Sequence, residues 1–409
     1  MKKLLVILIP VFAVALFMTQ VDEDLSEETT KLIDRVHSEG GSESFLYLYG
    51  IFASEVEDPL NVGSKLLAEY RKLDSDDSYN VIEYPDSEKL TLPTGDEFCK
   101  VWEHDCLKYI FSSQFDIEQL LREHRLLVSR SNRFIEFDEF KTLSKPTVHE
   151  IFPPYQYISA AERLKILEAI SSYRAGNIKA AIDSLLLQFS KLRRTMELQD
   201  NLIGKLVILM KLSEIIDVLS VILTNEEGTV KLVPGLSQSE KSFFMIASRE
   251  FSTSYYTFKG LEKHPGFFEI GGNSLAWITR IMYKPNMTIN SVAPVYSNLE
   301  RLSLLSPSDF ANQIEVSNSY LPSTSKLRNY VGSVLISVSP PQYAEYVARF
   351  QDFEAKLALF NQVHHFKLKF DKMKNPYYGD EIPRETEGNL CFSGPLEDKR
   401  HLRCLKVKI

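Results

Sequence analysis

The sequence predicts a mainly α-helical protein, a multi-helix bundle or irregular helical array that is closed by a small C-terminal antiparallel β meander. Apolar residues recur at helical spacing through most of the chain, which indicates amphipathic helices. After Asn375-Pro376 the pattern changes, because residues 390–392 and 405–409 alternate apolar and polar side chains with period two. A sheet this small is not stable alone, so we expect it to pack on the helices.

Composition sets the class of protein. The 409 residues are 44% hydrophobic and 25% charged, which is enough for a full core and excludes disordered, collagen-like and mini-protein classes. This length allows two or three domains or one large helical array. A formal net charge of −8 argues against nucleic acid as a partner, since phosphate binding needs a basic face.

The N-terminus has the pattern of a targeting segment. Lys2 and Lys3 precede an uncharged run, Leu4–Met18, and acidic residues follow from Asp22, which places the N-terminus in the cytosol and the body across the membrane. The Lys-Lys start is typical of bacteria, so the body is expected in the periplasm. If residues 19–21 are included, the run is about 27 Å long as a helix, whereas the hydrocarbon core of a bilayer is about 30 Å thick. We expect a single-pass inner-membrane anchor; the alternative is cleavage and a secreted or periplasmic protein.

Proline pairs and composition divide the chain. Lys145-Pro146 and Pro153-Pro154 mark a boundary or a bend. The expected regions are a membrane anchor or signal segment (1–21), an acidic N-terminal helical region (22–150), a central helical domain (151–370) and the C-terminal β hairpin or meander (371–409).

Helices in the first region follow from apolar spacing and caps. Two short helices are expected over 44–73, the second beginning at Asp58-Pro59, where an aspartate cap precedes a first-turn proline. A polar loop with many acids follows, and a helical stretch then begins near Trp102 and continues towards Leu143 with one or two breaks.

Residues 159–223 are the clearest helical block. Two apolar stripes flank a turn at Ala175-Gly176-Asn177. The next helix, 202–223, is apolar on nearly all sides, but four charged side chains make a membrane span costly and favour a central buried helix. These four are Lys205, Lys211, Glu214 and Asp217.

Further helices are expected towards the C-terminus. Apolar spacing indicates helices over about 240–259, 273–283, 288–304 and 326–338. Ser339-Pro340-Pro341 supplies a cap and first-turn proline for a long helix with aromatic residues at helical spacing.

One helix pair carries a resemblance. The passage 173–181, Tyr-Arg-Ala-Gly-Asn-Ile-Lys-Ala-Ala, resembles the turn of a tetratricopeptide hairpin, whose arrays bind peptides or proteins. It covers about 34 residues and does not recur at that period, whereas such repeats are stabilised by stacking. Generic helix packing is therefore the favoured interpretation of this hairpin.

The four cysteines form two close pairs, Cys99 with Cys106 and Cys391 with Cys404, which indicates two local disulfides in an oxidising compartment. Residues seven apart on one helix are about 10 Å apart, so Cys99 must lie outside the helix that carries Cys106. The alternative is a metal cluster of Cys99, His104 and Cys106, which lacks an evident fourth ligand.

Catalytic motifs are nearly absent. No GxSxG, HExxH, GxGxxG or GxxxxGK[ST] sequence occurs. Ser323-Thr324-Ser325-Lys326 fits the SxxK pattern, in which Lys326 would activate Ser323 as in penicillin-binding proteins, but no KTG or SDN partner accompanies it. The favoured interpretation is that Ser323 or Ser325 caps a helix.

Metal and cofactor sites are not predicted. Asp74–Ser78 begins like a calcium loop, but Tyr79 replaces the glycine and Pro85 the glutamate that an EF-hand needs. His364 and His365 are adjacent on a helix and point in different directions, so one is expected at the surface and one partly buried.

Charge is distributed unevenly. Residues 22–97 hold 20 acids and 6 bases, whereas residues 98–409 hold 35 acids and 39 bases. Two explanations remain open: the acidic segment docks on the remainder of the chain, or it repels an anionic membrane and leaves the body free for a basic partner.

A second resemblance concerns the C-terminus. Asn375-Pro376-Tyr377-Tyr378-Gly379, followed by Glu387–Phe392, resembles the closing hairpin of many uncharacterised bacterial envelope proteins with an anchored N-terminus. The resemblance implies where the protein is located and how it folds, but it implies no activity. The predicted function is therefore binding or scaffolding of another envelope protein or peptide by a membrane-tethered periplasmic protein; the alternative is a periplasmic hydrolase that uses Ser323 and Lys326.

Overall fold

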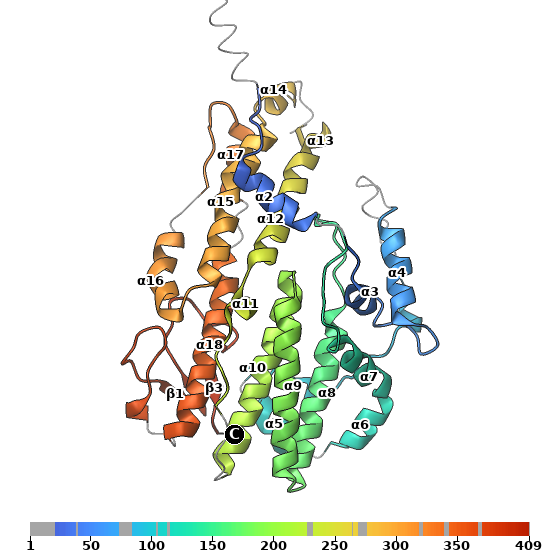
Figure 1. Ribbon diagram of the computed structural model, residues 1–409, viewed down its shortest axis with the longest axis vertical. Coiled ribbons are helices and arrows are strands. Elements are labelled where there is room, and N and C mark those ends of the chain that lie inside the picture. The colour runs from blue at the N-terminus through green and yellow to red at the C-terminus, as the bar shows by residue number, and fades with distance from the viewer. Residues whose placement is uncertain are drawn as a thin grey trace, which may run out of the picture.

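The computed structural model confirms a mainly helical chain with a small antiparallel sheet at its C-terminal end (Figure 1). The structure describes residues 21–37, 40–72, 84–103, 105–112, 115–226, 232–263, 265–268, 276–318, 322–338, 343–366 and 370–408. The expected anchor, Val21 apart, and most of the calcium-like loop lie outside these ranges. Within them, no helix has the length and apolarity to cross a membrane.

The N-terminal region consists of short helices with side-chain caps. Ser42 caps α3 and Asp58 caps α4, which confirms two short helices between residues 44 and 73. These helices pack closely because two glycines meet, and a Cβ on Gly63 would collide with the Leu46 carbonyl. The elements are α2 (Glu27–Val36), α3 (Glu43–Tyr49), α4 (Pro59–Tyr70), η1 (Asp86–Glu88), η2 (Asp96–Phe98), α5 (Cys106–Ser112), α6 (Ile117–Glu123) and α7 (Arg125–Phe134).

The centre is built from α8 (Tyr155–Arg174), α9 (Ile178–Leu198) and α10 (Leu202–Asn225), three consecutive helices of which α8 and α10 both pack on α9. Gly176 adopts φ +84° in the turn between α8 and α9, a conformation that favours glycine. α10 is buried on nearly all sides, its charged residues included, which confirms the expected central helix.

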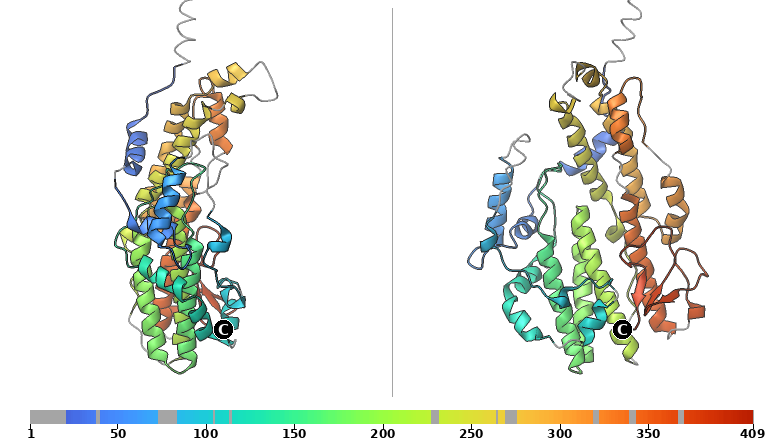
Figure 2. Two further views of the ribbon diagram at one scale, coloured as in Figure 1. Left: turned by 90° about the vertical axis from the view of Figure 1, so that its right-hand side faces the viewer. Right: turned by 180° about the vertical axis from the view of Figure 1, so that it is seen from behind.

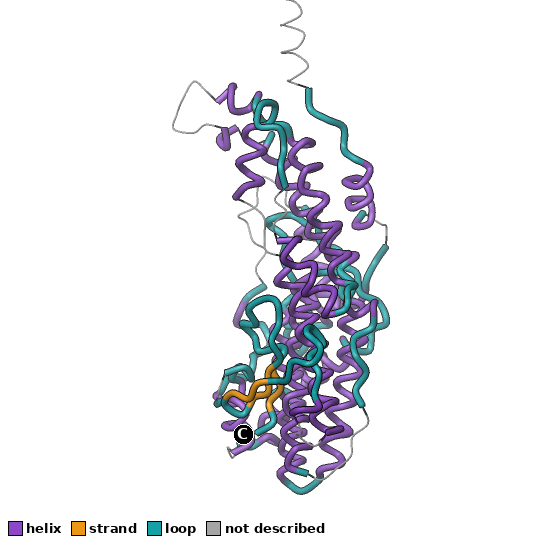
Figure 3. The backbone as a smooth tube through the Cα atoms, turned by 90° about the vertical axis from the view of Figure 1, so that its left-hand side faces the viewer, coloured by secondary structure: helices purple, strands orange, loops and turns teal. Residues whose placement is uncertain are grey.

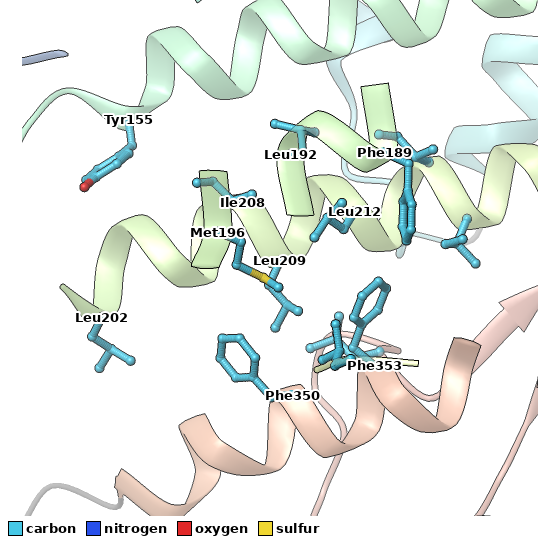
Figure 4. Close-up of a cluster of buried hydrophobic side chains, with 14 of the residues drawn as sticks. Tyr155, Phe189, Leu192, Met196, Leu202, Ile208, Leu209, Leu212, Phe350 and Phe353 are labelled. Atoms are coloured by element: carbon cyan, nitrogen blue, oxygen red, sulfur yellow. The ribbon is translucent and has the colours of Figure 1, made fainter. Parts of the chain in front are cut away.

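The main core lies where α18 meets this centre. Figure 4 shows Phe350 and Phe353 of α18 pointing towards Leu209 and Leu212 of α10 and Met196 of α9. All five are at most 1% exposed. Burial of such side chains contributes roughly 1.5–3 kcal/mol each, so this contact holds the C-terminal part of the chain on the central helices.

The remaining helices differ from the expected ranges in four places. The expected helix over 240–259 is interrupted at Ser242-Phe243, the helix expected over 273–283 ends at Ile281, with residues 273–275 outside the described ranges, and the helix over 326–338 begins only at Tyr330. A helix over 307–318, which Ser306 caps and Pro307 begins, was not expected. The elements are α11 (Gln238–Lys241), α12 (Phe244–Leu261), α13 (Pro265–Phe268), α14 (Ala276–Ile281), α15 (Pro285–Ser303), α16 (Pro307–Asn318), α17 (Tyr330–Val338), α18 (Tyr343–Phe366) and η3 (Phe370–Lys372).

The sheet consists of β1 (Arg384–Thr386), β2 (Asn389–Cys391) and β3 (Cys404–Lys406) in the order β1-β2-β3, and it lies low on one side of the body (Figure 3). Glu387 and Gly388 both have positive φ, which gives the tight turn that joins β1 to β2. β3 packs on α10 and α18, so the helices support the sheet as expected.

The first described residues are fastened to the upper half of the molecule. The Asp22 carboxylate accepts hydrogen bonds from the Asn286 and Met287 amides at the start of α15, at 2.8 and 3.1 Å, where a helix N-terminus favours an anion. Further along, Arg35 pairs with Glu300 at 2.9 Å. Residues 22–36 therefore dock on the rest of the chain. In this ion pair, however, the basic residue, Arg35, belongs to the segment that is acidic overall.

Candidate ligand-binding groove

A row of charged side chains lies on α10, inside the protein. Lys211, Glu214 and Asp217 are spaced three residues apart, so they share one face of the helix. Each is at most 9% exposed, and buried charges of this kind require partners. The partners come from α8, from α18 and from β3, and they organise the surrounding surface.

The first partner is Arg163 of α8. Its guanidinium pairs with Glu214, and it also donates to the Glu97 and Cys99 carbonyls at 3.0 and 2.7 Å. Lys211 reaches the same carboxylate at 2.8 Å. Burial raises the pKa of Glu214, but Arg163 and Lys211 outweigh it and hold that pKa below its ordinary value, so Glu214 is ionised.

The second set of partners joins α10 to the C-terminal elements. Lys356 of α18 donates to Asp217 at 2.6 Å and to Ser213 at 2.8 Å. The backbone amide of Lys406 in β3 donates to the other Asp217 oxygen at 3.1 Å. Burial raises the pKa of Asp217, and Lys356 opposes that rise. Asp217 thus fixes α18 and the sheet on the central helix.

An open groove of about 490 Å³ lies beside the Arg163–Glu214 pair, a volume typical of ligand sites. Its walls are the segment after η1, the first half of α8 and the first half of α10. Seven of the lining residues are apolar: Leu92, Pro93, Phe98, Pro153, Ala160, Ile203 and Val207. The polar ones are Tyr155, Gln156, Ser159, Arg163 and Lys211.

The wall formed by residues 90–99 is irregular, but it is fastened at both ends. The Leu90 amide donates to the Phe52 carbonyl at 2.8 Å, and the Tyr157 hydroxyl donates to the Leu90 carbonyl at 3.1 Å. At the other end Arg163 binds the Glu97 and Cys99 carbonyls. The groove is therefore preformed, which reduces the entropy lost when a ligand binds.

The chemistry of the groove suits non-covalent binding. Among the described residues that line it, none is a histidine, cysteine, aspartate or glutamate. Its two cations, Arg163 and Lys211, both pair with the Glu214 carboxylate. The lining offers mainly apolar contact and a few hydrogen bonds.

A second, smaller cavity lies on the other side of the α10 charges. It has a volume of about 30 Å³, and Trp102, Ser213, Asp217, Arg400 and Lys406 are among its lining residues. This space fits a water molecule and excludes a larger ligand. The Arg400 guanidinium lies 4.8 Å from the centre of the Trp102 ring and joins the two disulfide-bonded loops across the cavity.

Both predicted disulfides are confirmed. Cys99 and Cys106 are bonded with their Cα atoms 5.7 Å apart, and Cys99 lies just outside α5, whose first residue is Cys106. Cys391 of β2 and Cys404 of β3 face each other in the sheet and are also bonded. The sulfur atoms that the alternative interpretation assigns to a metal are thus held in a disulfide.

The SxxK residues lie outside both cavities. Ser323 and Lys326 are exposed in the loop before α17, and neither lines the groove or the smaller cavity. The Ser325 hydroxyl accepts from the Arg328 amide at 3.3 Å, but it closes a turn over residues 326–328 and not a helix, because α17 begins at Tyr330 and its Gly332 amide donates to Asn329. Catalysis by Ser323 and Lys326 stays a prediction.

The adjacent histidines also follow the expectation. His364 is half-buried, with its ring centre 4.7 Å from that of Phe360, and burial lowers its pKa to about 4. His365 is exposed. His364 is therefore neutral at physiological pH and acts as a packing residue.

Comparison of the chain with protein-family models, with curated proteins and with solved structures found no match. Sequence reasoning singled out Lys211 and Glu214 but missed Arg163 and the groove. One signal was present: Arg163 directly precedes the apolar stripe that begins at Leu164, where an unpaired cation would be costly.

Proposed function

We propose that the protein is a membrane-tethered periplasmic protein that binds an extended, largely apolar peptide segment of another envelope protein. The observation that carries the proposal is the open groove, whose lining is mainly apolar. Ile203, one of its lining residues, is 40% exposed, and Phe152, which directly precedes the lining residue Pro153, is 43% exposed. Exposed apolar side chains around a concave site mark a binding surface.

The lining favours a peptide over a charged metabolite. Pro93, Phe98 and Pro153 provide rigid apolar walls of the kind that hold extended or proline-containing segments. Gln156 and Ser159 supply donors and acceptors that suit the backbone of such a segment. An anionic ligand would have to compete with Glu214, which already pairs with both cations at the floor.

The tether rests on the sequence. The uncharged run Leu4–Met18 after Lys2 and Lys3 supports an anchor, and the two disulfides support an oxidising compartment. An anchored receptor meets its partner at a raised local concentration, so a groove of moderate affinity is sufficient.

Site-specific photo-crosslinking in intact envelopes tests the proposal. A photoreactive phenylalanine replaces Ile203 at the groove in one full-length variant and Leu187 in another, a 59% exposed leucine on α9 that does not line the groove. We expect a discrete adduct from position 203, with the cross-link mapped to one extended peptide, and none from position 187. Equal labelling from both positions refutes a peptide-binding groove.

A charged substitution provides the matching loss of function. Ile203→Glu places an unpaired carboxylate at the groove and should abolish binding of the peptide that the cross-link identifies, whereas Leu187→Glu should leave that binding unchanged. Ser323→Ala distinguishes the hydrolase alternative, because the groove proposal requires this variant to retain full binding.

A further inference from the structure

One end of the molecule exposes an apolar surface next to the place where the described chain begins. α17 starts at this end, which lies at the top of Figure 1 together with α13 and α14, and Figure 2 shows the same arrangement from two further sides. Four apolar side chains form what we call the α17 stripe: Leu327, Tyr330, Val334 and Val338, which are 83%, 52%, 44% and 76% exposed. Ile281 of α14 and Phe267 of α13 are exposed at the same end.

The stripe results from the way α17 packs. Its opposite face lies on α15, where Ile336 is buried and Gly332 approaches so closely that a Cβ would collide with Thr288 and Asn329. No residue from Tyr330 to Val338 is charged. Residues three and four apart share a helix face, so the outward face of α17 is apolar where a solvent-facing helix is ordinarily polar.

The position of Val21 indicates what covers this face. Arg328, immediately before α17, donates to the Val21 carbonyl at 2.8 Å, so the chain enters the body beside the stripe. Two residues, Thr19 and Gln20, lie between Val21 and Met18, the last residue of the apolar run, so Val21 lies within about 11 Å of Met18. If the run lies in a bilayer, as the proposed tether requires, this end of the body lies at the membrane surface.

We propose that the α17 stripe inserts into the boundary between headgroups and acyl chains of the bilayer that holds the N-terminal segment, so that the body lies against the membrane. An amphipathic element of this kind buries its apolar face about 5–10 Å deep, with Tyr at the interface. The exposed charges at this end are mixed, with Arg280 and Lys326 opposed by Glu23 and Glu262. Apolar insertion therefore drives the contact, and it should persist at high salt.

Tryptophan quenching in full-length protein tests this proposal, which rests on the proposed tether. Trp102 and Trp277 are replaced by phenylalanine, and a single tryptophan is introduced by Val334→Trp or, as the control on α9, by Leu187→Trp. The protein is reconstituted in vesicles of phosphatidylethanolamine and phosphatidylglycerol whose acyl chains carry bromine. We expect roughly half of the emission to be lost from Val334→Trp and almost none from Leu187→Trp, in low and in high salt.

The outcomes separate the tether from the stripe. If the protein sediments with the vesicles but Val334→Trp is quenched no more than Leu187→Trp, the tether is retained and the inference is overturned. Residues 1–20 or a second copy of the chain would then be what covers the α17 stripe. Protein that stays in the supernatant overturns both. Val334→Asp with Val338→Asp gives an independent test, because quenching of a Tyr330→Trp reporter should then fall to the control level while sedimentation is unchanged.

Discussion

The buried carboxylate of Glu214 gives the sharpest prediction for stability. Glu214→Gln keeps the shape of the side chain but removes the negative charge that pairs with Arg163 and Lys211. Arg163 keeps its bonds to the Glu97 and Cys99 carbonyls, so Lys211 is the group that loses its main partner. Breaking a buried pair in this way costs roughly 3–5 kcal/mol.

The cost has an upper bound, because Lys211 can lose its proton in the folded state. With an unfolded pKa near 10.4 and about 1.36 kcal/mol per pH unit, a neutral lysine at pH 7 costs about 4.6 kcal/mol. The folded state then binds fewer protons than the unfolded state, so the stability of the variant rises with pH between the two pKa values. At pH 9 the cost of a neutral lysine, and with it the upper limit on the loss of stability, is lower by about 2.7 kcal/mol.

Urea unfolding of the oxidised full-length protein at pH 7 and pH 9, followed by circular dichroism, measures this effect. We expect Glu214→Gln to lose about 3 kcal/mol at pH 7 and clearly less at pH 9, and Lys211→Met in the same chain to restore at least half of the loss. The surface pair Glu27–Lys31 provides the control, since Glu27→Gln should leave the midpoint unchanged. A loss below about 1 kcal/mol, or one independent of pH, contradicts the assigned pairing.

Three further predictions concern packing, cross-linking and pH. Gly204→Ala should destabilise by about 1–3 kcal/mol, because the new Cβ collides with the Tyr155 hydroxyl, whereas Gly260→Ala, with open space around it, should not; urea midpoints compare the two. Replacing Cys391 and Cys404 by alanine should cost about 3 kcal/mol and accelerate amide exchange in β2 and β3, with exchange in α9 unchanged. Burial raises the pKa of Asp352 to about 7, so its contribution to stability should fall as the pH rises from about 4 to 7, and Asp352→Asn should flatten that slope in pH-dependent unfolding.

Local sequence patterns predicted the parts of the fold that local physics determines. The burial of α10 followed from its apolar length and from the cost of placing Lys205 or Asp217 in lipid, and the sheet followed from period-two alternation. Cysteine spacing predicted both disulfides. In each case the pattern that carries the prediction lies within one element or between residues close in the sequence.

The groove could not be predicted in this way. Its outer wall, residues 90–99, has no periodicity, and its position depends on Arg163, which lies 64 residues beyond Cys99. The exposure of the α17 stripe is also a tertiary property, since the pattern from Tyr330 to Val338 predicts a helix without indicating which face is covered. Such features depend on contacts between distant segments, which single-sequence periodicity does not report.

The positions of the Asp217 partners in the sequence also bear on when the fold can be completed during synthesis of the chain. Lys356 follows Asp217 by 139 residues and Lys406 by 189, so both are synthesised long after α10. Until Lys356 and Lys406 have been synthesised, the central helix contains a carboxylate without these partners, and its burial in the core is unfavourable. A chain that ends between Lys356 and Lys406 lacks the amide that donates to Asp217, so β3 supplies the last of the partners on which closure of this part of the interior depends.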